Sequence, residues 1–197
     1  AEQQSLRFER ALGLAVKAAA LAHEPALLHS TSTLMGELLL QLGRTHDALA
    51  AYREALDFAV DPEGRGRGLF GIASALRVMD RHEEALEALD RAEAQLANTA
   101  DARTKAQLQT LRGNLCFPLG RFDACLESHQ RAHRFAIEAD SALEIARALG
   151  GLGDAYYQRG ELVTARTHFA QCVQEARKHN LANVLLSKLR MLALNEA

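Results

Sequence analysis

Apolar residues recur at helical spacing through most of the chain, and short polar or glycine-containing breaks separate the apolar segments. In the stretch 113–132 one such segment ends at Gly120, and a second starts at once with Phe122, Cys125 and His129 on one face. Two amphipathic helices joined by so short a break fold back on each other as an antiparallel hairpin. The pattern therefore predicts an all-helical chain built from helical hairpins.

The hairpin pattern returns about every 40 residues, and the positions within it keep their character. The small residue at Gly113 is matched by Gly36, Ala73 and Gly153, with spacings of 37, 40 and 40 residues along the series. A fixed period of this size, built on helical hairpins, is typical of an α-solenoid. Three other positions repeat in the same way: Cys125 with Ala48, Ala85 and Ala165; His129 with Tyr52, Leu89 and Phe169; and Gly120 with Gly43, Asp80 and Gly160.

This order of small, turn and aromatic residues resembles the tetratricopeptide repeat. The long period and the sequence Arg112-Gly113-Asn114 are similar to the branch that includes the kinesin light chain and the Leu-Gly-Asn adaptors. Arg112 stands where that branch usually has leucine, and Asp80 replaces a turn glycine. The resemblance implies an all-α fold, a right-handed α-solenoid of antiparallel hairpins with about ten helices in a superhelix.

The sequence predicts a single repeat domain over residues 1–197. Because the chain starts inside a helical pattern and without methionine, we expect it to be a fragment of a longer protein. Asp61-Pro62-Glu63-Gly64 is expected to form a loop, and Thr99 or Asp101 to cap the helix that follows them. The expected parts are the second helix of a preceding hairpin at 1–24, four repeats at 27–60, 65–97, 102–138 and 142–178, and a terminal helix at 181–196.

The composition and charge argue against several kinds of partner and against a disulfide-bonded fold. Apolar residues make up 48% of the chain and the formal net charge is −2, which predicts no nucleic-acid partner for this domain. No apolar run is long enough to span a bilayer, so we expect no membrane partner. Three cysteines without CxxC spacing predict no disulfide framework and a cytoplasmic location.

Two short groups of residues resemble ligand-binding motifs, one for a dinucleotide and one for zinc, but both are better explained by packing. Residues 66–71 satisfy the pattern GxGxxG, but the dinucleotide site requires a preceding strand, so we favour an adaptable helix start. Cys116, Cys125 and His129 are a possible zinc ligand set, although Cys125 and His129 occupy packing positions of the repeat. No catalytic set is visible, and we predict a protein that is not an enzyme and needs no cofactor or metal.

The first helix of each hairpin carries a stripe of polar and aromatic residues. In a solenoid of hairpins the first helices line the concave side, so we expect a peptide-binding groove there. The resemblance implies that Asn114 bonds the ligand backbone, whereas Glu37, Ser74 and Asp154 occupy the equivalent positions in the other repeats. The residues predicted to bind a peptide are Arg67, Phe70, Ser74, Arg77, Asn114, Phe117, Arg147, Asp154, Tyr157 and Arg190.

The predicted function is therefore a protein–protein interaction scaffold that binds an extended peptide or partner segment in its concave groove. Four arginines against Glu37 and Asp154 favour a peptide that carries an acidic group. Two alternatives stay open at this point. The chain could be a sensor module whose catalytic or DNA-binding output domain lies outside it, or a self-association unit that forms a homodimer.

Overall fold

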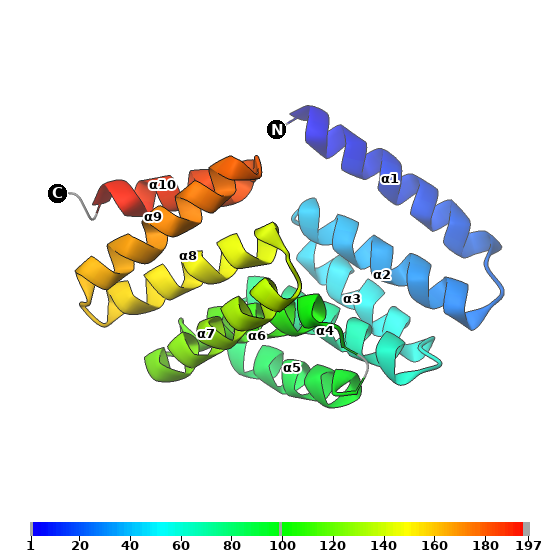
Figure 1. The fold of residues 1–197 in the computed structure, drawn as a ribbon. Helices are drawn as coiled ribbons and strands as arrows, with labels where there is room; N and C mark the ends of the chain where they lie inside the picture. Colours follow the sequence, from blue (N-terminus) through cyan, green and yellow to red (C-terminus); the bar gives the residue numbers. More distant parts are fainter. Residues whose placement is uncertain (1, 99, 195–197) are drawn as a thin grey trace. The chain divides into compact units, whose positions relative to one another are not determined.

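The structure, a computed structural model, describes residues 2–98 and 100–194, without the side chains of residues 2, 190 and 192–194. Over these residues it contains ten α-helices and no β-strand, which confirms the predicted all-helical fold (Figure 1). The helices are α1 (Glu2–Leu21), α2 (Pro25–Gln41), α3 (Thr45–Asp57), α4 (Pro62–Val78), α5 (His82–Leu96), α6 (Ala102–Cys116), α7 (Phe122–Glu138), α8 (Ala142–Gln158), α9 (Leu162–Lys178) and α10 (Ala182–Leu194).

Contacts between helices divide the chain into two compact units, Ala1–Thr99 and Ala100–Ala197. In unit 1, α2 pairs with α3 and α4 pairs with α5, while α1 packs on α2. In unit 2 the pairs are α6 with α7 and α8 with α9, and α10 packs on α9 and α8. Within each unit the first helices of successive pairs also touch, α2 with α4 and α6 with α8.

Each hairpin turns through one residue in the left-handed region of backbone space. Gly120 has a φ of 69°, and Asp80, which replaces a turn glycine, adopts a φ of 57°. Aspartate tolerates this conformation better than most residues because its short polar side chain can bond locally. The second hairpin therefore keeps the turn of the others without its glycine; Gly43 and Gly160 have φ values of 73° and 76°.

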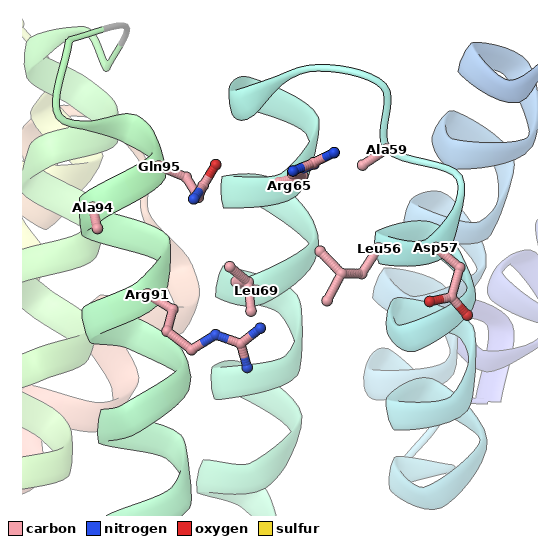
Figure 2. A pocket seen from close by; sticks show the side chains of 8 residues that line it. All are labelled: Leu56, Asp57, Ala59, Arg65, Leu69, Arg91, Ala94 and Gln95. Carbon is pink, nitrogen blue, oxygen red and sulfur yellow. The ribbon is translucent and has the colours of Figure 1, made fainter.

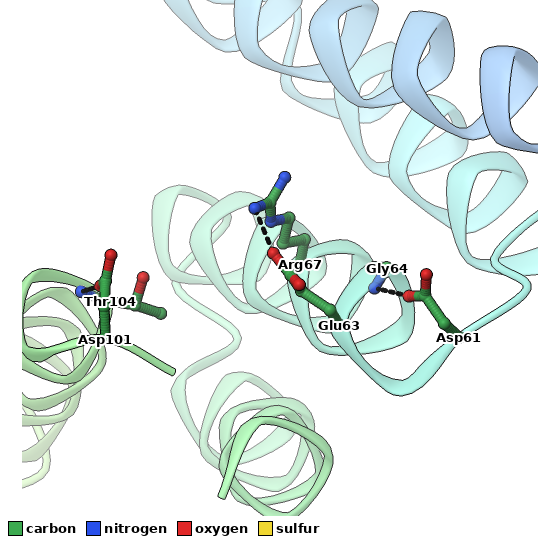
Figure 3. A network of polar contacts seen from close by, with 6 residues as sticks. All are labelled: Asp61, Glu63, Gly64, Arg67, Asp101 and Thr104. Carbon is green, nitrogen blue, oxygen red and sulfur yellow. Dashed lines mark hydrogen bonds and ion pairs between the residues drawn. The ribbon is translucent and has the colours of Figure 1, made fainter. Parts of the chain in front are cut away.

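The expected loop at residues 61–64 is wrong beyond Asp61, because α4 starts at Pro62. Proline suits a first helical position, where no backbone N–H is needed, and the Asp61 carboxylate accepts a 2.7 Å hydrogen bond from the Gly64 N–H. Asp101 caps α6 in the same way, accepting from the Thr104 N–H at 2.7 Å (Figure 3). The other expected cap, Thr99, lies outside the described residues.

Glycines provide space for large side chains between neighbouring helices. Tyr52 on α3 lies between Gly36 on α2 and Gly71 on α4, where an added Cβ would approach its ring to 2.7 and 2.2 Å. At Gly66 an added Cβ would lie 2.3 Å from Leu96 Cγ. The glycines of the GxGxxG pattern are thus contact positions in the middle of a packed helix, and the expected adaptable helix start is wrong.

The apolar core of each unit follows the repeat positions. Ala48, Ala85, Cys125 and Ala165, the small residues of the second helices, are fully buried. None of the described helices combines the length and the apolar character that crossing a lipid bilayer requires.

Candidate functional site

In unit 2 a polar bridge joins α6 and α8. Gln107 Nε2 donates a 3.0 Å hydrogen bond to Glu144 Oε1, and Arg147 Nη1 donates to the same oxygen at 3.2 Å. The Glu144 residue is only 1% exposed, whereas the Arg147 side chain is 46% exposed. The buried carboxylate therefore holds a solvent-accessible guanidinium group beside α6.

Four residues predicted from the sequence belong to these two helices or their caps, and Arg147 alone takes part in the bridge. Asn114 is exposed on α6, and Phe117 at the C-terminal cap of α6 is half-buried. The Phe117 ring contacts Phe122 edge-on, with 6.3 Å between the ring centroids. Arg147 and the half-buried Tyr157 come from α8. The two helices thus present an amide, a guanidinium and two half-buried aromatic rings.

The fifth predicted residue of this unit, Asp154, is engaged by the last helix. Lys188 on α10 forms an ion pair with the Asp154 carboxylate, and its ammonium lies 5.7 Å from the centroid of the Phe169 ring. Burial raises the pKa of Asp154, and the neighbouring Lys188 opposes that rise. In this structure Asp154 therefore anchors α10. Arg190 belongs to α10, but its side chain lies outside the described part.

In unit 1 the predicted residues lie on α4. Arg67 is exposed and pairs with Glu63 one turn earlier (Figure 3). Ser74 uses its hydroxyl within the helix, donating to the Phe70 carbonyl oxygen at 2.9 Å. Phe70 is half-buried and Arg77 is exposed. The two units thus carry separate rows of predicted residues, one on α4 and one on α6 and α8.

The predicted excess of positive charge on these faces is smaller in the structure. The count from the sequence included Arg67 and Arg147 but omitted Glu63 and Glu144, which pair with them. Each acid stands three or four residues before its arginine, where neighbouring turns of one helix bring side chains together. That spacing was the available signal for Glu144, the main residue of the site that the sequence analysis missed.

The cysteine and histidine set suggested for zinc is a packed apolar layer. An added Cβ at Gly113 or Gly151 would lie 2.4 or 2.3 Å from the His129 ring, so the ring fills the space between α6 and α8. Burial, and then Lys188, lowers the pKa of His129 to about 4. Burial, and then Cys116 and Asp154, raises the pKa of Cys125 to about 12, which disfavours the thiolate that zinc requires. Among the described residues no three potential ligands gather around a metal position.

Comparisons with known proteins identify the repeat. Two family models described as tetratricopeptide repeat match residues 30–59 and 104–178, together just over half of the chain. No curated protein matches the sequence.

Solved structures share the fold at low sequence identity. A Rap protein complexed with Competence and Sporulation Factor is 16% identical with a TM-score of 0.77, covering 88% of this chain and 49% of that one. MamA is 19% identical with a TM-score of 0.60, covering 91% and 94%. A signal transduction ATPase with a tetratricopeptide repeat sensor from Pyrococcus horikoshii is 13% identical with a TM-score of 0.79, covering 98% and 31%. The chain spans about half the length of the Rap protein.

Proposed function

The chain belongs to the tetratricopeptide repeat family, and from this premise we propose that it is a protein-interaction module that binds an extended peptide. The proposed site is the exposed face of α6 and α8 in unit 2. The likeness to the Rap protein, whose structure contains Competence and Sporulation Factor, supports a role in binding another molecule.

One observation carries the proposal: the Gln107–Glu144–Arg147 bridge holds α6 and α8 side by side and leaves the Arg147 side chain half-exposed. An extended peptide needs donors and acceptors for its backbone and apolar surfaces for alternate side chains. Asn114 supplies both a donor and an acceptor in one amide group. Phe117 and Tyr157 supply partly exposed rings on the same two helices.

An acidic group on the peptide is the finer part of the proposal, and Arg147 is its main support. Its Nη1 atom donates to Glu144, and the planar guanidinium group carries further N–H donors on a half-exposed side chain. A carboxylate of the peptide would bind those donors in an orientation that the buried Glu144 has already fixed.

The test is a peptide selected from an unbiased library on the full chain. We expect Asn114→Ala and Arg147→Gln each to weaken its binding about tenfold, since each removes one polar contact of about 1.5 kcal/mol. Glutamine at 147 can still donate to Glu144, so folding should be intact by circular dichroism. Arg131→Gln, an exposed change on α7, is the matched control and should leave binding unchanged. Equal binding by all three variants would place the site elsewhere.

A second candidate function is a sensor segment of a longer signalling protein. The Pyrococcus horikoshii ATPase favours it, because this chain matches only 31% of that protein, whose name includes a tetratricopeptide repeat sensor. In that case the selected peptide should change the activity of an output domain in the full-length natural protein. A full-length protein whose domains all ignore the peptide would reject this candidate.

A further inference from the structure

A separate pocket lies in unit 1, away from the faces of the first helices considered so far. It has a volume of about 480 Å³ and is lined by the C-terminal part of α3, the N-terminal half of α4 and the C-terminal half of α5 (Figure 2). The volume is within the range of ligand-binding pockets. The lining residues are Leu56, Asp57, Ala59, Arg65, Leu69, Arg91, Ala94 and Gln95.

The lining combines an apolar floor with cationic walls. Leu56 and Leu69 supply branched aliphatic surface from α3 and α4, and Arg91 extends from α5 toward α4 (Figure 2). Arg65 adds a second guanidinium group from α4, so two cations and one carboxylate, that of Asp57, line the pocket. Within residues 2–98 neither arginine side chain forms an ion pair with another described residue, so their donors face solvent.

The two cations recur in the adjacent repeat, where the positions of Arg65 and Arg91 hold Lys105 and Arg131, but they do not recur in the repeat after it. Two repeats further along the sequence, the positions of Arg65, Arg91 and Gln95 hold Ile145, Gln171 and Glu175. The equivalent helices α7, α8 and α9 therefore carry neither cation, and Gln171 keeps only an uncharged donor. Packing of the repeat does not require the cations, because Leu149 keeps the aliphatic position of Leu69 in the repeat where both cations are absent.

We propose that this pocket binds an acidic segment of a partner protein, in which a carboxylate stands next to a branched aliphatic side chain. The aliphatic group would cover the Leu56 and Leu69 floor, and the carboxylate would accept parallel hydrogen bonds from a guanidinium group. A protein segment fits better than a small molecule, because Asp57, Arg65, Arg91 and Ala94 are exposed around an open hollow. Small ligands usually bury most of their surface.

The test uses the full chain and the synthetic peptide acetyl-Glu-Leu-Leu-Glu-amide, followed by amide and arginine side-chain NMR signals. We expect the peptide to shift signals of residues 56–69 and 91–95. Arg65→Gln and Arg91→Gln should each weaken binding about tenfold, the order expected for one lost charge-assisted hydrogen bond. Arg177→Gln, an exposed change on α9, is the control and should bind like the original chain.

Two comparisons make the test decisive. The neutral peptide acetyl-Gln-Leu-Leu-Gln-amide should bind at least tenfold more weakly, because it lacks the carboxylates. Equal binding of the two peptides, shifts confined to α6–α10, or no shift through the millimolar range would overturn the proposal. Binding of 4-methylpentanoate as tight as that of the acidic peptide would also overturn it, because the ligand would then be a small acid. Shifts of residues 56–69 and 91–95 report on this pocket alone and not on the face formed by α6 and α8.

Discussion

The buried imidazole of His129 makes the stability of the protein depend on pH. The residue is 2% exposed, its ring lies between Gly113 and Gly151, and its Nδ1 has no hydrogen-bond partner among the described residues. Burial, and then Lys188, lowers its pKa from 6.5 to about 4. Between these two values the unfolded chain binds a proton that the folded chain does not, so acid favours unfolding.

The size of the effect follows from that interval. One pKa unit corresponds to about 1.36 kcal/mol, so the His129 contribution is fully present above pH 6.5 and falls by about 3 kcal/mol as the pH drops to 4. Between pH 7.5 and pH 5 the loss is about 2 kcal/mol by the same relation. His133 and His168 also have pKa values lowered by burial and change stability in the same direction. The contribution of His129 is therefore isolated by comparing the original chain with a variant that differs only at His129.

Phenylalanine is the suitable replacement for His129. Tyr52 shows that a six-membered ring fits between two glycines at the equivalent position, and Phe169 occupies the same position in the next repeat. Urea unfolding from pH 7.5 to pH 5 should show His129→Phe gaining about 2 kcal/mol over the original chain as the pH falls. His46→Gln, an exposed change on α3, should keep the pH dependence of the original chain. Parallel pH profiles for His129→Phe and the original chain would refute the reasoning.

Three further predictions concern stability and association. Gly113→Ala should destabilise the chain by about 1–3 kcal/mol in urea unfolding, because its Cβ would lie 2.4 Å from His129 Nε2; Gly13→Ala, with nothing within 4 Å, should be neutral or stabilising. Asp80→Gly should raise the free energy of unfolding by up to about 1 kcal/mol, since glycine relieves a φ of 57°; an unchanged midpoint would contradict this. Truncation after Lys178 should lower the melting temperature and promote association in light scattering, by uncovering the apolar surface under α10; a monodisperse, equally stable product would show that α10 is dispensable.

The repeat pattern was sufficient to predict most of the fold. Small residues recurring about every 40 positions identify the contacts between paired helices, and those at Ala48, Ala85, Cys125 and Ala165 are fully buried. The start of α4 was predicted incorrectly because Pro62 and Gly64 favour a loop by composition. The helix begins there because the Asp61 cap and the tolerance of proline at a first helical position outweigh that tendency.

The polar network of the site was harder to predict. The position of Asp154 in the repeat suggested ligand binding, but the Lys188 that engages it is 34 residues away in the sequence. Gln107 and Glu144 are 37 residues apart and meet because successive first helices pack together. Such pairings depend on the rotation of each helix about its axis, and a hydrophobic pattern with glycines on several sides of the helix leaves that rotation poorly defined.

A crystal structure of the full chain with a library-selected peptide is the most direct test of the proposed function. We predict that the peptide lies across α6 and α8, with its backbone hydrogen-bonded to the Asn114 amide. A peptide carboxylate, where present, should lie at Arg147, and the buried Glu144 should keep its contacts with Gln107 and Arg147. A peptide bound to α7 and α9, with the α6 and α8 face left to solvent, would contradict the account.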